Sequence, residues 1–412
     1  MAGFLLACVD EEEATVPQQN IPNTTALVLV GGGGARGAYE AGVISGIAEI
    51  LASRDVVRPP VGIFTGSSMG AFNATWAAAN AHRPLWEVGE LLKLWHGMSL
   101  NKVLSKRGGA AAWLRDFQRM VGTSPRALEP DAFEQQFVDM ISWATLRSNL
   151  KHGLVRALLL PAHDLGSAQT VIFSDLAEAV DVRPPAERDI LVQPTEVGPD
   201  HVVASAALMP LLEPRTIDGR VLCDGGFRFP TPLAPAIWAG AERMIVVTAA
   251  TARTVRGLDA TPSLATRPDF GLGKMLNGML LDPVRSDLRS LSTTNKVVAA
   301  SRAAGATGAG RYRQIEALVF QPSRDPGVLA SEVLEDLRRA SPWRQVADMM
   351  LGIQRAWQGD LYSYALLDER YTRALTALGR NDAFARAEEI LRFFRDEPSC
   401  ETEENRLRVE VE

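Results

Sequence analysis

The chain has 412 residues, of which 46% are hydrophobic and 22% are charged, and its formal net charge is −6. This composition is typical of a globular protein with a sizeable core, and it excludes disorder as the main state. Because the acidic balance gives no reason to attract phosphates, nucleic acid is not an expected partner. Three scattered cysteines exclude a disulfide framework and a cysteine-based zinc site, so we expect a reducing, cytoplasmic compartment.

The length exceeds that of a usual single hydrophobic core, which predicts one large domain and a smaller appended segment. We expect residues 1–23 to form a flexible leader, with no convincing signal peptide because a basic n-region is missing. Residues 24–322 then form the main domain, and residues 323–412 form a helical extension with an acidic tail. No stretch approaches the roughly 20 apolar residues of a membrane-spanning helix, so any membrane contact is expected to be peripheral.

Two strand, turn and helix units open the main domain. Ala26–Val30 is a continuous apolar run, as in a buried parallel strand, and it leads through a glycine run into an apolar helical pattern that starts at Tyr39. Val61–Thr65 is a second short apolar strand, followed by a tight turn at 66–70 and an alanine-rich helix over Ala71–Ala79. Two such units predict an α/β fold with a mostly parallel sheet.

The rest of the chain carries further, less regular patterns. More strands are expected at Val155–Leu160, Thr170–Phe173, Arg220–Cys223, Met244–Thr248 and Ile315–Phe320. An aromatic stretch over 85–143 indicates helices that form either ordinary packing faces or a substrate-covering cap. Within 250–310, a helix is expected over Leu272–Leu281, ended by Pro283, and part of the segment is expected to be a mobile loop. Two apolar stripes predict helices in the extension, namely Val346, Met349, Met350, Ile353 and Trp357, and Phe384, Ala387, Leu391 and Phe394.

The sharpest local signal is Gly66-Ser67-Ser68-Met69-Gly70, a G-x-S-x-G between a predicted strand and a predicted helix. In a nucleophile elbow the serine occupies a strained turn, and the flanking glycines avoid collisions with the neighbouring strand and helix. Ser68 would stand at the helix N-terminus, where the N–H of Met69 can stabilise an oxyanion. The pattern in this context indicates a nucleophilic serine.

A second signal is the glycine run Gly31-Gly32-Gly33-Gly34-Ala35-Arg36-Gly37 after the first predicted strand. Successive backbone N–H groups at the head of a helix form an anion site, which suits either a dinucleotide pyrophosphate or the oxyanion of an acyl transfer. A dinucleotide site needs an acidic residue roughly 20 residues further on, and only Asp55 lies in that region. A plain flexible turn is the third interpretation, and no P-loop pattern is present.

A serine nucleophile also needs a base. None of the histidines lies in a recognisable late-chain triad position; they are His82, His96, His152, His163 and His201. Asp224 is the alternative, because it follows a predicted strand and precedes Gly225-Gly226. An aspartate at the carboxyl end of a strand points into the crevice where the other loops meet, although a simple Asp-Gly-Gly turn is the competing interpretation.

Together these three patterns resemble the patatin-like phospholipase family, which is marked by G-G-G-x-[RK]-G, G-x-S-x-G and D-G-[GA] in that chain order. They occur here as Gly32 to Gly37, Gly66 to Gly70, and Asp224 to Gly226. The stretch Ala204 to Pro210 is similar to the family's A-S-x-A-x-P, although its proline comes one residue late. The resemblance covers residues 24–322, which would be the catalytic domain, and implies a patatin-like three-layer α/β/α fold with a mostly parallel central sheet.

The resemblance implies a lipid acyl hydrolase of the phospholipase A, lysophospholipase or esterase type, working through an acyl-enzyme. It implies Ser68 as nucleophile and Asp224 as base, and it implies roles at the oxyanion hole or substrate for Gly32, Gly33, Gly34, Arg36 and Met69. Arg36 would order the glycine loop or meet a headgroup phosphate. The remaining motif glycines are Gly37, Gly66, Gly70, Gly225 and Gly226.

The implied chemistry needs no metal or organic cofactor, and its substrate would be a phospholipid or another acyl-ester lipid. Three alternatives remain open. The same site could transfer the acyl group to an alcohol, the fold could serve a non-catalytic lipid- or partner-binding protein, or the glycine loop could bind a nucleotide.

Overall fold

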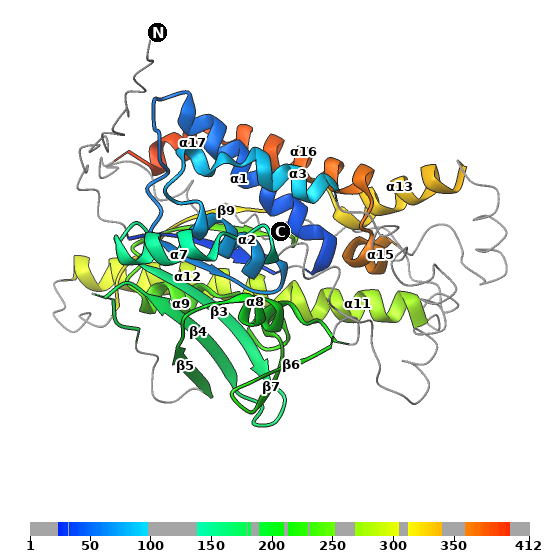
Figure 1. Cartoon of the computed structure of the whole chain (residues 1–412). Coiled ribbons are helices and arrows are strands. Elements are labelled where there is room, and N and C mark those ends of the chain that lie inside the picture. The colour runs from blue at the N-terminus through cyan, green and yellow to red at the C-terminus, as the bar shows by residue number, and fades with distance from the viewer. Residues whose placement is uncertain are drawn as a thin grey trace, which may run out of the picture.

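The computed structural model describes residues 24–31, 33–97, 138–178, 180–182, 189–209, 213–229, 231–251, 268–304, 312–339 and 359–395. Within these stretches, nine strands form one mixed sheet (Figure 1). The strands are β1 Thr25–Val30, β2 Ile63–Gly66, β3 Ala157–Asp164, β4 Thr170–Leu176, β5 Ile190–Pro194, β6 Arg215–Ile217, β7 Arg220–Asp224, β8 Arg243–Thr248 and β9 Glu316–Phe320. The main path runs β5-β4-β3-β2-β1-β8-β9, and β7 pairs with both β3 and β6.

The centre of the sheet is parallel. Val28 of β1 lies opposite Thr65 of β2 on one side and Val246 of β8 on the other, and all three strands run in the same direction. The pairs β2–β3 and β8–β9 are also parallel, whereas β4 and β7 run antiparallel to β3. The carboxyl ends of β1 and β2 therefore meet at one edge of the sheet, which brings the glycine run and the elbow together.

Helices cover both faces of the sheet. Alternate residues of β1 enter different cores: Leu27 and Leu29 pack with the helices on one face, and Ala26, Val28 and Val30 pack with those on the other. The first face carries α1 Gly37–Ala52, α2 Met69–Ala79, α3 Gly89–Gly97, α7 Trp143–Lys151, α8 Pro199–Ala206, α13 Pro326–Arg339, α16 Glu369–Phe384 and α17 Ala387–Phe393. The second face carries α9 Leu233–Trp238 and α12 Asp282–Ala303. The predicted layered α/β fold is confirmed, and α11 Pro268–Leu280 and α15 Gly359–Ala365 add to it (Figure 1).

The C-terminal helices share the main core with the N-terminal ones. Figure 1 shows α16 alongside α1, and the two helices approach closely through small residues. A β-carbon on Gly42 would lie 2.8 Å from Cα of Thr376, and one on Gly379 would lie 2.8 Å from the backbone nitrogen of Val43. Helix α1 is therefore buried on nearly all sides. The apolar pattern in the sequence indicated only one packed face, and the face that packs against α16 is formed by small residues.

The segment over 250–310 contains one more helix than its pattern predicts. A helix was expected over Leu272–Leu281, and α11 covers Pro268–Leu280; a 22-residue helix follows at once. Pro283 lies in the first turn of α12, where its missing N–H leaves no helix hydrogen bond unmade. Pro283 therefore starts a helix as well as following one. The mobile loop that was expected in part of this segment stays a prediction, because residues 252–267 and 305–311 lie outside the described residues.

Several expectations fall outside the described residues. These are the leader 1–23, Gly32, Pro210, the apolar stripe over 346–357 and the acidic tail. In the aromatic stretch, Trp113, Phe117 and Phe137 lie outside as well, while Trp86 and Trp95 are buried in the main core, which favours packing for these two. Among the described helices, none combines the length and the apolar character that crossing a bilayer requires.

Candidate active site

Ser68 forms the point of a sharp turn between β2 and α2. Its φ of 56° and ψ of −132° are rare for a residue with a side chain and cost about 1–3 kcal/mol. A β-carbon on Gly66 would collide with the backbone of Gly70, and one on Gly70 would lie 3.0 Å from the carbonyl carbon of Leu29. Both glycines are thus required by close backbone approaches, as the elbow pattern predicts.

The glycine loop lies against this turn. A β-carbon on Gly31 would lie 2.8 Å from Cβ of Ser68, so the loop passes directly over the serine. Gly33 and Gly34 have positive φ values of 83° and 56°, which glycine adopts without steric cost. The loop then enters a short 3₁₀ helix, η1 Gly34–Arg36, that continues into α1.

The end of the loop also packs against the elbow helix. A β-carbon on Gly37 would lie 2.8 Å from the ring of Trp95 and 3.0 Å from Cβ of Met69. Met69 is the first residue of α2 and is largely buried. The end of the glycine loop therefore lies against the first residue of the elbow helix.

Asp224 ends β7 and is fully buried. Its Oδ1 accepts a hydrogen bond of 2.7 Å from the N–H of Gly226, in the 3₁₀ turn η3 Gly225–Phe227, while Oδ2 has no hydrogen bond of good geometry with the described residues. Burial raises the pKa of Asp224 to about 6, and the nearby Ser68 hydroxyl and the Gly226 N–H limit that rise. The carboxylate thus keeps one free oxygen beside the serine.

One short segment holds both residues in place. The backbone carbonyl of Ser205 accepts the N–H of Ser68, and the carbonyl of Ala207 accepts the N–H of Asp224, each at 3.0 Å. The Ser205 hydroxyl in turn donates to the carbonyl of Pro161 at 2.6 Å. In the sequence, Ala204 to Pro210 stood out only by its resemblance to a family motif. No local pattern indicated that its backbone carbonyls would bind the two candidate catalytic residues.

Arg36 does not face solvent. It is 2% exposed, and its guanidinium donates to the Ser363 hydroxyl at 2.9 and 2.6 Å and lies 4.0 Å from the ring centre of Tyr364. These partners come from α15. Of the two expected roles of Arg36, ordering the glycine loop therefore fits the contacts, whereas a headgroup phosphate would first have to displace them.

An apolar cluster adjoins the site. It consists of Leu208, Leu276, Leu280 and Tyr364, with Phe227 and Leu361 packed against it. A β-carbon on Gly226 would lie 3.1 Å from a methyl group of Leu280, which places this cluster directly beside Asp224. Ser68 is only 3% exposed, so the nucleophile candidate is buried close to this apolar cluster.

Three of the five histidines take part in other contacts, while the buried Nδ1 atoms of His82 and His163 have no hydrogen-bond partner among the described residues. His96 bonds to Thr376, His152 bonds to Ser148, and His201 accepts the N–H of Gly198. No described group of three or more histidine, cysteine, aspartate or glutamate side chains is arranged to hold a metal ion. The titratable group that the Ser68 hydroxyl does contact is Asp224, whose pKa that hydroxyl lowers against the effect of burial.

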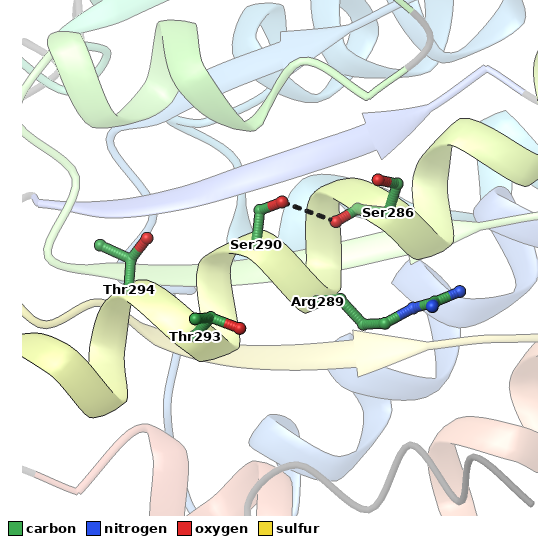
Figure 2. A pocket seen from close by; sticks show the side chains of 5 residues that line it. All are labelled: Ser286, Arg289, Ser290, Thr293 and Thr294. Carbon is green, nitrogen blue, oxygen red and sulfur yellow. Dashed lines mark hydrogen bonds between the residues drawn. The ribbon is translucent and has the colours of Figure 1, made fainter.

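A polar surface hollow lies elsewhere. Figure 2 shows its lining, Ser286, Arg289, Ser290, Thr293 and Thr294, all from α12. Ser290 donates to the carbonyl of Ser286, a bond within the helix. None of the predicted site residues lines this hollow.

Comparison with known proteins agrees with this geometry. The model of the patatin-like phospholipases matches residues 28–237, about half of the chain. The chain belongs to the patatin-like phospholipase family, whose general activity is lipid acyl hydrolysis, and the resemblance seen in the sequence is confirmed.

Among solved structures, VipD from Legionella pneumophila aligns with 13% sequence identity and a TM-score of 0.35. The alignment covers 73% of this chain and 61% of the VipD chain, so this chain spans less than two thirds of that protein's length. No curated protein sequence matches significantly.

Proposed function

We propose that this protein hydrolyses acyl esters of lipids with Ser68 as nucleophile and Asp224 as general base. The observation that carries the proposal is the placement of a fully buried carboxylate, with one free oxygen, beside a serine held in a strained turn. Strained backbone of this kind is concentrated at active sites, which supports the proposal. A base with a pKa of about 6 is mostly ionised at neutral pH and still close enough to neutrality to exchange a proton.

The reaction proceeds in two halves. The Ser68 hydroxyl passes its proton to Oδ2 of Asp224 while its oxygen bonds to the ester carbonyl carbon, and the carbonyl electrons move onto oxygen. When this tetrahedral intermediate collapses, the alcohol leaves with the proton held by Asp224. Water then attacks the acyl-enzyme in the same way and releases the fatty acid.

The oxyanion would be held by backbone N–H groups of the glycine loop and of Met69, which begins α2. Removing one such donor costs about 3 kcal/mol in serine hydrolases. The N-terminus of α2 adds a positive partial charge at the same place. The substrate is proposed to be a phospholipid or another acyl-ester lipid, because the cluster around Leu276 and Leu280 offers apolar contacts to an acyl chain.

The test compares the parent chain with Ser68→Ala and Asp224→Asn on p-nitrophenyl esters and on phospholipid vesicles. Both variants are expected to stay folded and to lose more than about a thousandfold in kcat/KM. Ser290→Ala on α12 serves as the matched control, because its hydroxyl bonds only within its own helix. An active parent with unaffected variants would contradict the proposal. Transfer of the acyl group to an added alcohol in preference to water would identify a transferase instead.

A further inference from the structure

We propose that Ser363 and Tyr364 of α15 are positioning residues of the catalytic site, which hold the oxyanion loop in place through its glycines and through Arg36. This inference rests on the proposed function. It assigns a catalytic task to the region after residue 322, which carries none of the three sequence patterns.

The glycine loop is held between two surfaces. On its inner side Gly31 contacts the elbow, where a β-carbon would lie 2.8 Å from Cβ of Ser68. On its outer side it contacts α15: a β-carbon on Gly33 would lie 2.6 Å from the Tyr364 ring, and one on Gly34 would lie 2.9 Å from the Tyr364 carbonyl carbon. Tyr364 therefore sets how far the loop can move away from Ser68, and the glycines are needed for its close approach.

Arg36 fastens the same loop to the same helix. Its Nε and Nη2 donate to the Ser363 hydroxyl, and Nη1 donates to the Tyr364 hydroxyl at 3.3 Å. Nη2 also reaches the backbone carbonyl of Asp360 at 3.5 Å. Because Arg36 and Ser363 are both buried, breaking these bonds would leave a charged group without partners away from water.

A third element fixes α15 itself. Oδ1 of Asn277 on α11 accepts the Tyr364 hydroxyl at 2.7 Å and Nη2 of Arg36 at 3.3 Å. Lys274 of α11 forms an ion pair of 2.6 Å with Asp360 of α15. The loop, α15 and α11 thus form one connected group, and the partners Arg36 and Ser363 are 327 residues apart in the chain.

Loop position matters because oxyanion donors act only when they are aimed at the developing charge. Ser363→Ala removes the acceptor of two Arg36 hydrogen bonds, and Tyr364→Phe removes one hydroxyl while leaving the ring on Gly33. We expect kcat on a short soluble ester to fall about tenfold or more for Ser363→Ala and by less for Tyr364→Phe, with KM changed less than about twofold. Ser290→Ala should match the parent.

Hydrogen exchange gives a readout that does not depend on activity. Amides in a peptide spanning residues 31–37 should exchange faster in Ser363→Ala, while a peptide over β8 stays unchanged. If both variants match Ser290→Ala in kcat and in exchange over 31–37, α15 has no positioning role and the inference fails. If Ser363→Ala does not fold, kcat and the exchange over 31–37 of Tyr364→Phe alone test the inference.

The two proposals fail in different ways. A parent chain that hydrolyses no ester and does not react with a fluorophosphonate would overturn the proposed function. Exchange over 31–37 would then still show whether α15 holds the loop. Conversely, an active parent whose variants keep full kcat would leave the hydrolase standing and remove only the role of α15.

Discussion

Glu40 and Asn73 are hydrogen-bonded at 2.8 Å beneath the elbow, between α1 and α2. The Asn73 amide also donates to the carbonyl of Gly37 at 3.0 Å and accepts the indole N–H of Trp95 at 3.1 Å. Glu40 is almost fully buried, and this burial raises its pKa to about 8, with the bond from Asn73 limiting the rise. A neutral carboxyl group therefore lies under the nucleophile turn at neutral pH.

The first prediction concerns stability. Because the folded-state pKa of Glu40 is above its ordinary value of 4.5, the folded protein holds this proton where the unfolded chain has lost it. Its contribution is fully present below pH 4.5 and is lost as pH rises to about 8, by a few kcal/mol in total. Glu40→Gln should flatten this part of the pH dependence in urea unfolding. Glu49→Gln, at an exposed ion pair with Arg380, is the control; equal slopes in the parent and Glu40→Gln would contradict the prediction.

The second prediction concerns the pH dependence of catalysis, whose midpoint should follow Asp224 and not Glu40. Burial raises the pKa of Asp224 from 3.8 to about 6, and a general base works only when ionised. We therefore expect kcat/KM for a neutral soluble ester to fall below a midpoint near pH 6 and to level off above it. Rates between pH 4.5 and 8, corrected for Ser68→Ala, would measure this midpoint. A midpoint near pH 4 would contradict the prediction, because it would mean that water reaches the Asp224 carboxylate in the free enzyme.

Two adjacent serines allow a sharp comparison. The Ser67 hydroxyl is fully buried and has no hydrogen-bond partner among the described residues. Because removing an unpaired buried hydroxyl costs little, Ser67→Ala should keep its melting temperature and stay within about threefold of the parent rate. Ser68→Ala should be inactive. Mass spectrometry after fluorophosphonate treatment should find the label on Ser68, and a label on Ser67 would reassign the nucleophile.

A pair of left-handed glycines separates backbone strain from packing. Gly34 has a φ of 56° and its β-carbon would overlap Tyr364, whereas Gly153 has a φ of 72° with open space around it. Gly153→Ala should cost about 1 kcal/mol of unfolding free energy from strain alone. Gly34→Ala should cost more than about 3 kcal/mol and should lower kcat as the loop shifts. Denaturant unfolding and steady-state kinetics check both, and equal costs would show that Tyr364 gives way.

Local patterns were sufficient for the centre of the fold and for part of the site. β1 and β2 are short, mostly apolar runs; glycine follows β1 and ends β2, so the sequence indicates two strands that each lead into a turn. Two strands lack such a signal: β5 is partly exposed and contains a proline, and β6 has only three residues. These segments become strands because they pair with neighbouring strands, which a local pattern does not reveal.

The same limit holds for the site. Ser68 and Asp224 belong to recognisable patterns, whereas Ser205 holds Ser68 through its backbone carbonyl, a group that every residue has. Ser363 is buried by tertiary packing, and no periodicity relates it to Arg36. A partial signal existed for α16: its small residues Gly379 and Ala383 are spaced by four, as are Gly42 and Gly46 of α1.

The packing of α1 on α16 also has a consequence for the order of folding. The Tyr39 hydroxyl donates to Asp382 at 3.0 Å, and the two residues are 343 positions apart. At ordinary rates of synthesis, roughly 15 to 70 seconds separate their emergence from the ribosome. Throughout that interval the small-residue face of α1 has no partner, and contacts of such long range form slowly. Nascent chains should therefore need protection by chaperones until α16 has been made, and translation that stalls before it should yield aggregation-prone protein.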